Sequence, residues 1–207
     1  MLSALTPRRR FAVHAASALL VFVACRSKET QTISDSVAGM DSAPAAATPT
    51  PLPVRLTDAQ IAHIAITANS VDSAAGEFAL ANVKNASVKE FARAMITEHG
   101  EANRKAKALA TKLALVPEDN DASRALRSDA DQARAALMGR SGADFDRAYI
   151  DHEVQAHQGV LDQLDQNLIP GAQDAELRSL LQAVRPMVAG HLDRAKRIQP
   201  TIATASQ

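Results

Sequence analysis

Residues 87–113 read SVKEFARAMITEHGEANRKAKALATKL, and they decide the fold class. Apolar and small side chains return here every three or four residues, which is the period of one face of an α-helix. Residues 87–90 have the pattern of a capping box, and Pro117 ends the segment. The stripe consists of Val88, Phe91, Met95, His99, Ala102, Ala106, Leu109 and Leu113. The sequence therefore predicts a long amphipathic helix whose buried face includes one histidine.

Three further stretches show the same period. One begins at a capping box at residues 57–60, one follows Ser141 and one follows Asp174, all residue types that cap helix starts. A weaker helical pattern covers residues 122–138. Four long helices with short connections predict an all-α fold, an antiparallel four-helix bundle over residues 57–199. The weaker pattern adds an extra short helix between the second and third long helices.

The composition supports helices and excludes several classes of protein. The 23 Lys and Arg residues balance the 23 Asp and Glu residues, so the chain lacks the basic excess of a nucleic-acid-binding protein. Aromatic residues make up only 3% of the chain, too few for a platform that stacks single-stranded bases. We therefore predict no nucleic-acid partner. The single cysteine rules out an internal disulfide framework.

The first 25 residues predict a lipoprotein-type signal peptide. Arginines at positions 8–10 precede an apolar stretch over residues 11–24, which is shorter than the ~20 residues of a membrane-spanning helix. Cys25 follows Val23 and Ala24, a pattern that resembles the lipobox where bacterial lipoproteins are cleaved and acylated. Lipid on Cys25 would attach the chain to a membrane. The alternative is an ordinary secretory signal with an incidental cysteine.

The segments that flank the bundle predict no fold of their own. Residues 26–56 are rich in Ser, Thr, Ala and Pro, which predicts a disordered tether, and residues 200–207 predict a disordered tail. We expect a periplasm-facing, lipid-anchored protein of the bacterial cell envelope, or a secreted one if no lipid is added. Arg26, rather than Asp, follows the cysteine and favours the outer membrane. The sequence indicates no particular protein partner.

Three histidines occupy core positions on three different predicted helices: His99, His157 and His191. Such positions normally hold Leu, Ile, Val or Ala. Asp72 lies beside the stripe of the first helix, and Glu153 lies one turn before His157. Imidazoles with a carboxylate suit Zn, Cu or Fe. These five residues are therefore the candidate ligands of one transition-metal ion, or the members of a site that responds to protonation.

Helical rise tests whether the five side chains could meet. At ~1.5 Å per residue, Asp72, His99 and His157 lie about 20 to 21 Å from the nearest predicted turn. His191 lies at about 30 Å, more than one helical turn away, and Glu153 at about 27 Å. The count allows the three histidines to converge but does not require it.

Two other functions are compatible with the same residues. The histidines could form a buried polar network in a cofactor-free structural or interaction module of the envelope. They could also build an atypical catalytic metal site. The sequence contains no nucleophile triad and no phosphate-binding loop, so we expect a binding or structural protein rather than an enzyme. Asn103, one turn after His99, is the residue expected to orient that ring.

The segment from Val88 to His99, with Ala102-Asn103 after it, resembles the motif of a bacterial family known as domain of unknown function 4142. Residues 142–149, and Pro186 leading to His191, match further segments of that family in order and spacing. The resemblance covers roughly residues 57–199. It implies a ferritin-like four-helix fold and export, and it implies no particular activity.

The chain departs from this family in the first helix. The family usually has Glu-x-Glu-Leu-Gly, whereas residues 72–76 here are Asp-Ser-Ala-Ala-Gly, so one acid is kept as Asp72. A di-iron centre of the ferritin-like kind also needs Glu-x-x-His on two helices. The residues three positions before the core histidines are Ile96, Val154 and Val188. We therefore do not predict a di-iron oxidase.

Overall fold

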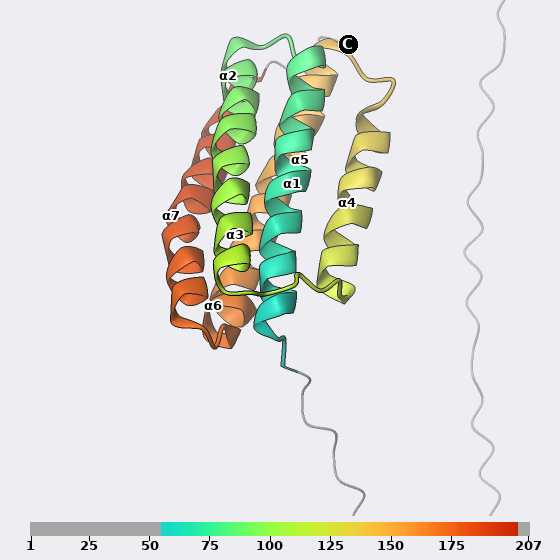
Figure 1. The fold of residues 1–207 in the computed structure, drawn as a ribbon. Helices are drawn as coiled ribbons and strands as arrows, with labels where there is room; N and C mark the ends of the chain where they lie inside the picture. The colour runs from blue at the N-terminus through green and yellow to red at the C-terminus, as the bar shows by residue number, and fades with distance from the viewer. Residues whose placement is uncertain (1–54, 203–207) are drawn as a thin grey trace, which may run out of the picture. The chain divides into compact units, whose positions relative to one another are not determined.

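The computed structural model describes residues 55–202, and every regular element in that part of the chain is helical (Figure 1). The elements are α1 (Asp58–Asn82), α2 (Ala86–Ala94), η1 (Met95–His99), α3 (Gly100–Lys112), α4 (Asp121–Leu137), α5 (Gly142–Gln163), η2 (Leu164–Leu168), α6 (Ile169–Gly171), α7 (Ala175–Ile198) and η3 (Gln199–Thr201). The elements η1 and η2 are π-helical turns, and η3 is a 3-10 turn. The all-α prediction is confirmed.

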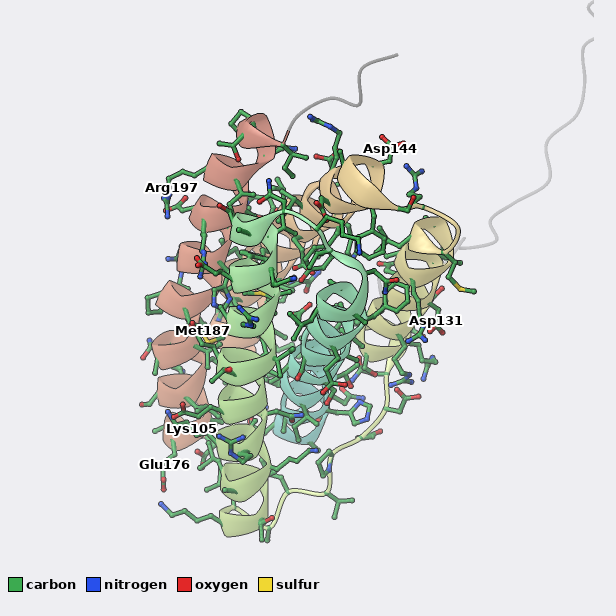
Figure 2. The ribbon with its side chains drawn as sticks, turned by 90° about the horizontal axis from the view of Figure 1, so that it is seen from above. Lys105, Asp131, Asp144, Glu176, Met187 and Arg197 are labelled. Atoms are coloured by element: carbon green, nitrogen blue, oxygen red, sulfur yellow. The ribbon has the colours of Figure 1, made fainter. Side chains whose placement is uncertain are left out.

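Two helical hairpins dominate the arrangement. The elements α2, η1 and α3 form one continuous stretch that packs antiparallel to α1, while α5, η2 and α6 form another that packs antiparallel to α7 (Figure 1). The hairpins contact each other where α2 and α3 meet α7 and where α1 meets α5. Charged side chains such as Lys105, Asp144 and Arg197 point away from the helices (Figure 2). The interior of the domain therefore lies between the two hairpins.

The weak helical pattern over residues 122–138 corresponds to α4, which packs outside the hairpins against α1 and α5 (Figure 1). With 17 residues, α4 matches the predicted stretch to within one residue at each end. It buries only Ser123 and Leu137. Because few of its side chains enter the core, its apolar stripe is weak.

Of the four predicted helix caps, two make the predicted hydrogen bonds and two do not. The Thr57 hydroxyl accepts from the amide of Gln60 at 3.2 Å, and Asp174 accepts from the amides of Glu176 and Leu177. The capping box predicted at residues 87–90 is wrong, because Asn85 Oδ1 caps the helix by accepting from Ser87 and Val88. Asn is at least as good a cap as Ser. Ser141 precedes α5, but its side chain makes no capping hydrogen bond.

Each hairpin also provides a carboxylate that holds a loop of the other. Asp146 near the start of α5 accepts hydrogen bonds from the amides of Lys84 and Asn85, at 3.0 and 2.7 Å. Asp58 at the start of α1 accepts from the amides of Gln173 and Asp174, at 2.8 and 2.9 Å. Hydrogen bonds to a charged acceptor are stronger than neutral ones. These two contacts therefore tie the hairpins together at opposite ends of the domain.

The apolar core forms two clusters. One cluster includes Phe91, Phe145 and Ile198, and the other includes Ile61 and Leu181. Several of the side chains that are both buried and polar form one connected group. They are Asn69, Asp72, His99, Glu153, His157 and His191. The core is therefore interrupted by a polar layer in the middle of the domain.

Gly76 allows α1 to approach η1 closely. A Cβ atom at this position would lie 2.9 Å from the carbonyl oxygen of Ala92 and 3.0 Å from the Cβ of Met95. These separations are shorter than van der Waals contact, so a larger residue would push the two helices apart. The glycine therefore helps to set the position of His99, which ends η1.

The boundaries of the packed region differ slightly from those predicted. Residues 199–201 form η3, and Ile202 is buried in the cluster that contains Phe91, so the tail predicted to begin at residue 200 is packed as far as residue 202. Leu56, assigned to the tether, packs against the cluster that contains Ile61. The predicted signal peptide with Cys25, and the tether up to residue 54, lie outside the described residues. Within residues 55–202, no helix has both the length and the apolar character needed to span a bilayer.

Candidate metal centre

Three histidine rings from three helices meet in the polar layer. His99 ends η1, His157 lies on α5 and His191 lies on α7. Their ring centroids are 5.0 to 5.5 Å apart, and one nitrogen from each ring lies within 4.8 Å of the other two. All three rings are buried. The structure thus brings together the three core histidines of the sequence in one cluster.

The π-helical turn η1 explains how two adjacent residues reach the same partner. His99 Nε2 lies 3.2 Å from His191 Nδ1, and Glu98 Oε2 lies 3.0 Å from His191 Nε2. In a regular α-helix, adjacent side chains point about 100° apart. The wider π turn lets Glu98 and His99 contact opposite edges of one ring. Single π turns inside α-helices are frequent at functional sites.

The outward-facing nitrogen of each ring faces an oxygen acceptor. His99 Nδ1 donates to Asn69 Oδ1 at 3.0 Å, His157 Nδ1 donates to the Glu153 carbonyl at 2.9 Å, and His191 Nε2 donates to Glu98 at 3.0 Å. The Asn69 orientation is set because its amide nitrogen donates to the Ala65 carbonyl at 2.8 Å. In a neutral ring the other nitrogen carries a lone pair. When all three rings are neutral, the three remaining nitrogens are therefore all acceptors.

Burial acts against protonation of two of the rings. Burial, together with the neighbouring His157 and His191, lowers the pKa of His99 to about 2. Burial also lowers the pKa of His191, although Glu98 opposes that shift. For His157 burial again lowers the pKa, but the Glu153 carboxylate 3.3 Å from Nδ1, the charge of Asp72 and the hydrogen bond to the Glu153 carbonyl outweigh it, and the net pKa is raised. His99 and His191 thus stay in the neutral form that binds metal ions.

The two carboxylates predicted as ligands stand behind the rings. Asp72 Oδ2 lies 3.5 Å from His99 Nδ1, and Glu153 Oε2 lies 3.3 Å from His157 Nδ1. Both therefore approach outward-facing nitrogens rather than the nitrogens that face one another. Burial raises the pKa of Asp72 to about 7, against an opposing effect of His157 and with a further increase from Glu153. The Glu153 carboxylate is 1% exposed, and neither of its oxygens has a hydrogen-bond partner.

His191 lies closer to the other histidines than helical rise alone indicated. The sequence estimate counted rise from the turn at Gly171, but α7 begins only at Ala175. Residues 172–174 add no helical rise. Counted from Ala175, His191 lies at about 24 Å, against about 21 Å for His157. The prediction of an offset greater than one helical turn is therefore wrong.

Sequence reasoning missed two residues that hold the rings. Asn69 and Glu98 position His99 and His191. Asn103 does not take the role predicted for it, because its amide donates to the Ser70 hydroxyl at 2.8 Å. A signal for Asn69 was present, since it lies three residues before Asp72 and so shares its helix face. The helical period gave no indication that Glu98 contacts His191, because in a regular α-helix Glu98 points in a different direction from the adjacent His99.

Comparison with known families assigns the chain. Residues 41–198 match the family described as domain of unknown function, DUF4142. The chain belongs to the DUF4142 family. The resemblance seen in the motif that ends at His99 is thereby confirmed, and the DUF4142 match includes all three histidines with Asp72 and Glu153. Searches of curated proteins and of solved structures find no match to this chain.

Proposed function

We propose that this DUF4142 protein binds one transition-metal ion through His99 Nε2, His157 Nε2 and His191 Nδ1. The arrangement of acceptors around the rings carries the proposal. When all three rings are neutral, each donates its one N–H to an oxygen outside the cluster, and three lone pairs then face one another. The oxygens that hold the rings are the partners that metal-bound histidines normally have. A cation is the species that satisfies all three lone pairs.

The spacing of the nitrogens supports the same conclusion. Two imidazole nitrogens bound to one zinc ion at about 2.0–2.1 Å, with tetrahedral angles, lie about 3.3 Å apart. His99 Nε2 and His191 Nδ1 lie 3.2 Å apart. Because His157 Nε2 is buried without a hydrogen-bond partner, it is free to complete the set. Three imidazoles suit Zn, Cu or Fe, and Asp72 and Glu153 support the rings rather than bind the ion.

Calorimetric titration of metal-stripped protein tests the site. We expect Zn²⁺ to bind with a stoichiometry of about one and to raise the melting temperature, because the ion binds only the folded state. Replacing any of the three histidines with glutamine should weaken Zn²⁺ binding at least 100-fold. His63→Gln is the matched control, since His63 is a half-buried histidine of α1 outside the cluster. It should bind Zn²⁺ like the native chain.

A second measurement uses only the native chain, so its result does not depend on whether the variants fold. Co²⁺ bound by the native chain should give the visible absorption bands of a four-coordinate site, and Zn²⁺ should displace it. Equal melting temperatures with and without Zn²⁺, Cu²⁺, Ni²⁺ or Fe²⁺ would contradict the proposal. That result would favour the cofactor-free interaction module, in which His157→Leu keeps or increases stability because it removes an unsatisfied polar nitrogen.

We also propose that the two hairpins form a ferritin-like four-helix bundle with α4 added outside. The contacts of α1 with α2–α3, of α5 with α7, and of α7 with α2–α3 support this arrangement. Amide hydrogen exchange tests it. The four hairpin helices should be protected together, and α4 should exchange faster because it buries only Ser123 and Leu137. Protection of α4 equal to that of α5 would contradict it.

We further propose that the chain is exported and anchored in the bacterial envelope by lipid on Cys25, facing the periplasm and favouring the outer membrane. The apolar stretch before Cys25 and the residues around it support this. In cells given labelled palmitate, the native chain should carry label and sediment with membranes. Cys25→Ser should lose both. A native chain that stays unlabelled would contradict the anchor and favour the secreted form.

A further inference from the structure

The three residues that accept hydrogen bonds from the histidine rings differ in exposure. Asn69 and Glu153 are buried, whereas the side chain of Glu98 is 50% exposed. His191, which is bonded to Glu98, is also the most exposed of the three histidines, at 5% against 2% or less for the other two. The cluster therefore lies nearest to solvent along the edge where Glu98 meets His191.

Glu98 has one oxygen free at this edge. Its Oε2 accepts from His191 Nε2 at 3.0 Å, and within residues 55–202 its other oxygen makes no hydrogen bond or ion pair. The other two acids beside the rings, Asp72 and Glu153, are both buried. Glu98 is thus the acid in contact with the cluster that a hydrated cation can reach from solvent without any movement of the helices.

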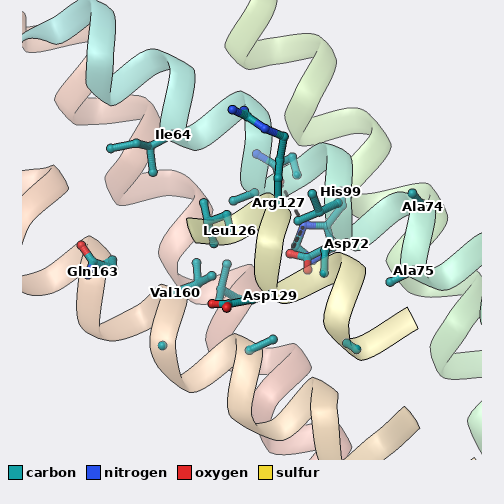
Figure 3. Close-up of a pocket in the computed structure, with 18 of the residues that line it drawn as sticks. Ile64, Asp72, Ala74, Ala75, His99, Leu126, Arg127, Asp129, Val160 and Gln163 are labelled. Carbon is teal, nitrogen blue, oxygen red and sulfur yellow. Dashed lines mark hydrogen bonds and ion pairs between the residues drawn. The ribbon is translucent and has the colours of Figure 1, made fainter. Parts of the chain in front are cut away.

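A cavity of about 980 Å³ offers a second approach to the cluster. It is lined by residues of α1, α3, α4, α5 and α7, but His99 is the only ring of the cluster among them. Figure 3 shows Asp72 beside His99 in the cavity wall. Asp72 and Asn69 approach Nδ1 of His99, whereas the ligand atom assigned above is Nε2. The cavity wall therefore meets the outer edge of one ring, away from the nitrogens that face one another.

We propose that Glu98 receives the metal ion at the surface and passes it beside the His191 ring to the three inner nitrogens. This role of Glu98 rests on the proposed metal centre and adds the route by which the ion enters. A carboxylate attracts divalent cations and can replace part of their water, because its oxygens are themselves metal ligands. An ion that moves to buried nitrogens must lose its hydration shell, which is costly. Glu98 lowers the barrier at that step.

Glu98→Gln separates this role from support of the ring. Glutamine keeps a side-chain oxygen that can accept from His191 Nε2, but it removes the negative charge. A group that lowers the barrier speeds entrance and exit alike, so both rates should fall about tenfold in the variant. The dissociation constant should stay within about threefold of the native value. A lower affinity with an unchanged association rate would show that Glu98 only supports the ring, and would overturn the proposal.

Co²⁺ allows both rates to be measured, because its visible absorption bands report binding directly. Stopped-flow mixing of metal-stripped protein with Co²⁺ gives the association rate, and mixing of the loaded protein with excess EDTA gives the dissociation rate. Glu101→Gln is the matched control, since Glu101 is similarly exposed but pairs with Lys105 at 2.7 Å instead of with a ring. It removes the same charge and should leave both rates within about twofold. Equal slowing in both variants would reduce the effect to net charge and overturn the proposal.

Ionic strength gives an independent readout. The Debye length falls from about 30 Å at 0.01 M salt to about 10 Å at 0.1 M, so salt weakens attraction by an exposed carboxylate. Association of Co²⁺ with the native chain should slow over this range, and it should slow less in Glu98→Gln. The same salt dependence in both chains would contradict capture by the charge of Glu98.

Asp72→Asn tests the route through the cavity. It removes the acid that lines the cavity beside His99, and we expect the association rate to stay within about twofold of the native rate. A tenfold slower association in Asp72→Asn, with native rates in Glu98→Gln, would place the route in the cavity and overturn the proposal. A native chain that binds neither Co²⁺ nor Zn²⁺ at equilibrium would overturn the metal centre together with this route. Normal binding with native rates in Glu98→Gln would overturn the route alone.

Discussion

Asp146 and Glu153 lie two helical turns apart on α5, and both are almost fully buried, at 2% and 1% exposure. Near the start of α5, Asp146 accepts hydrogen bonds from two backbone amides of the opposite hairpin. In the middle of the same helix, neither oxygen of Glu153 has a hydrogen-bond partner. Burial of a polar group without a partner costs stability. The buried acid near the end of the domain therefore stabilises the fold, whereas the buried acid in the middle lacks the hydrogen bonds that would offset its burial.

Removal of Asp146, whose carboxylate is fully hydrogen-bonded, should have the largest effect on stability. Asp146→Ala leaves the amides of Lys84 and Asn85 without their acceptor, and we expect a loss of about 3 kcal/mol of unfolding free energy. Urea denaturation measures the loss. Asp146→Asn, which keeps one acceptor oxygen, should lose less. Equal stability of Asp146→Ala and the native chain would show that the ends are not what holds the hairpins together.

The equivalent contact at the other end should matter less. Asp58 also accepts from two amides, but it is only half-buried, so water can replace part of what is lost. We expect Asp58→Ala to lower the unfolding free energy by about 1 to 2 kcal/mol. The same urea titration gives the value. A larger loss than for Asp146→Ala would contradict the ranking by burial.

Removal of the Glu153 carboxylate should change stability in the opposite direction. Glu153→Met replaces a buried carboxylate whose oxygens accept no hydrogen bond, although Oε2 lies 3.3 Å from His157 Nδ1, with an apolar side chain of similar length. We expect the metal-free variant to be about 1 kcal/mol more stable than the native chain. Zn²⁺ affinity should fall about 10-fold, because the group behind His157 is removed. A metal-free variant less stable than the native chain would remove the contrast between Glu153 and Asp146.

A surface pair should give the smallest effect. Asp165 accepts two hydrogen bonds from Arg185, which lowers the pKa of this exposed carboxylate. The stabilisation is thus present above the ordinary pKa of Asp and is lost as pH falls through the lowered value. Arg185→Gln should melt slightly below the native chain at pH 7, and the difference should vanish at low pH. A difference that persists in acid would point to lost packing instead.

Local patterns predicted much of this structure. The three- and four-residue spacing located the helices, and the caps at Thr57 and Asp174 follow from their side-chain chemistry. The same spacing identified the three core histidines. It failed for the cap of α2, which is Asn85 rather than Ser87, because both residue types can cap a helix and they lie only two positions apart. It also failed for the level of His191, because residues 172–174 of the loop add no helical rise.

The helical period and the three core histidines follow from the amino-acid order alone, since both are properties of neighbouring residues along one helix. Membership of the DUF4142 family also follows from the amino-acid order, through motifs within residues 41–198. Which oxygens His99 and His191 face was decided only when the helices packed. Asn69 contacts a residue 30 positions away and Glu98 contacts one 93 positions away. The π turn that brings Glu98 to His191 and the cavity beside His99 arise from contacts between helices. No pattern within a single helix specifies them.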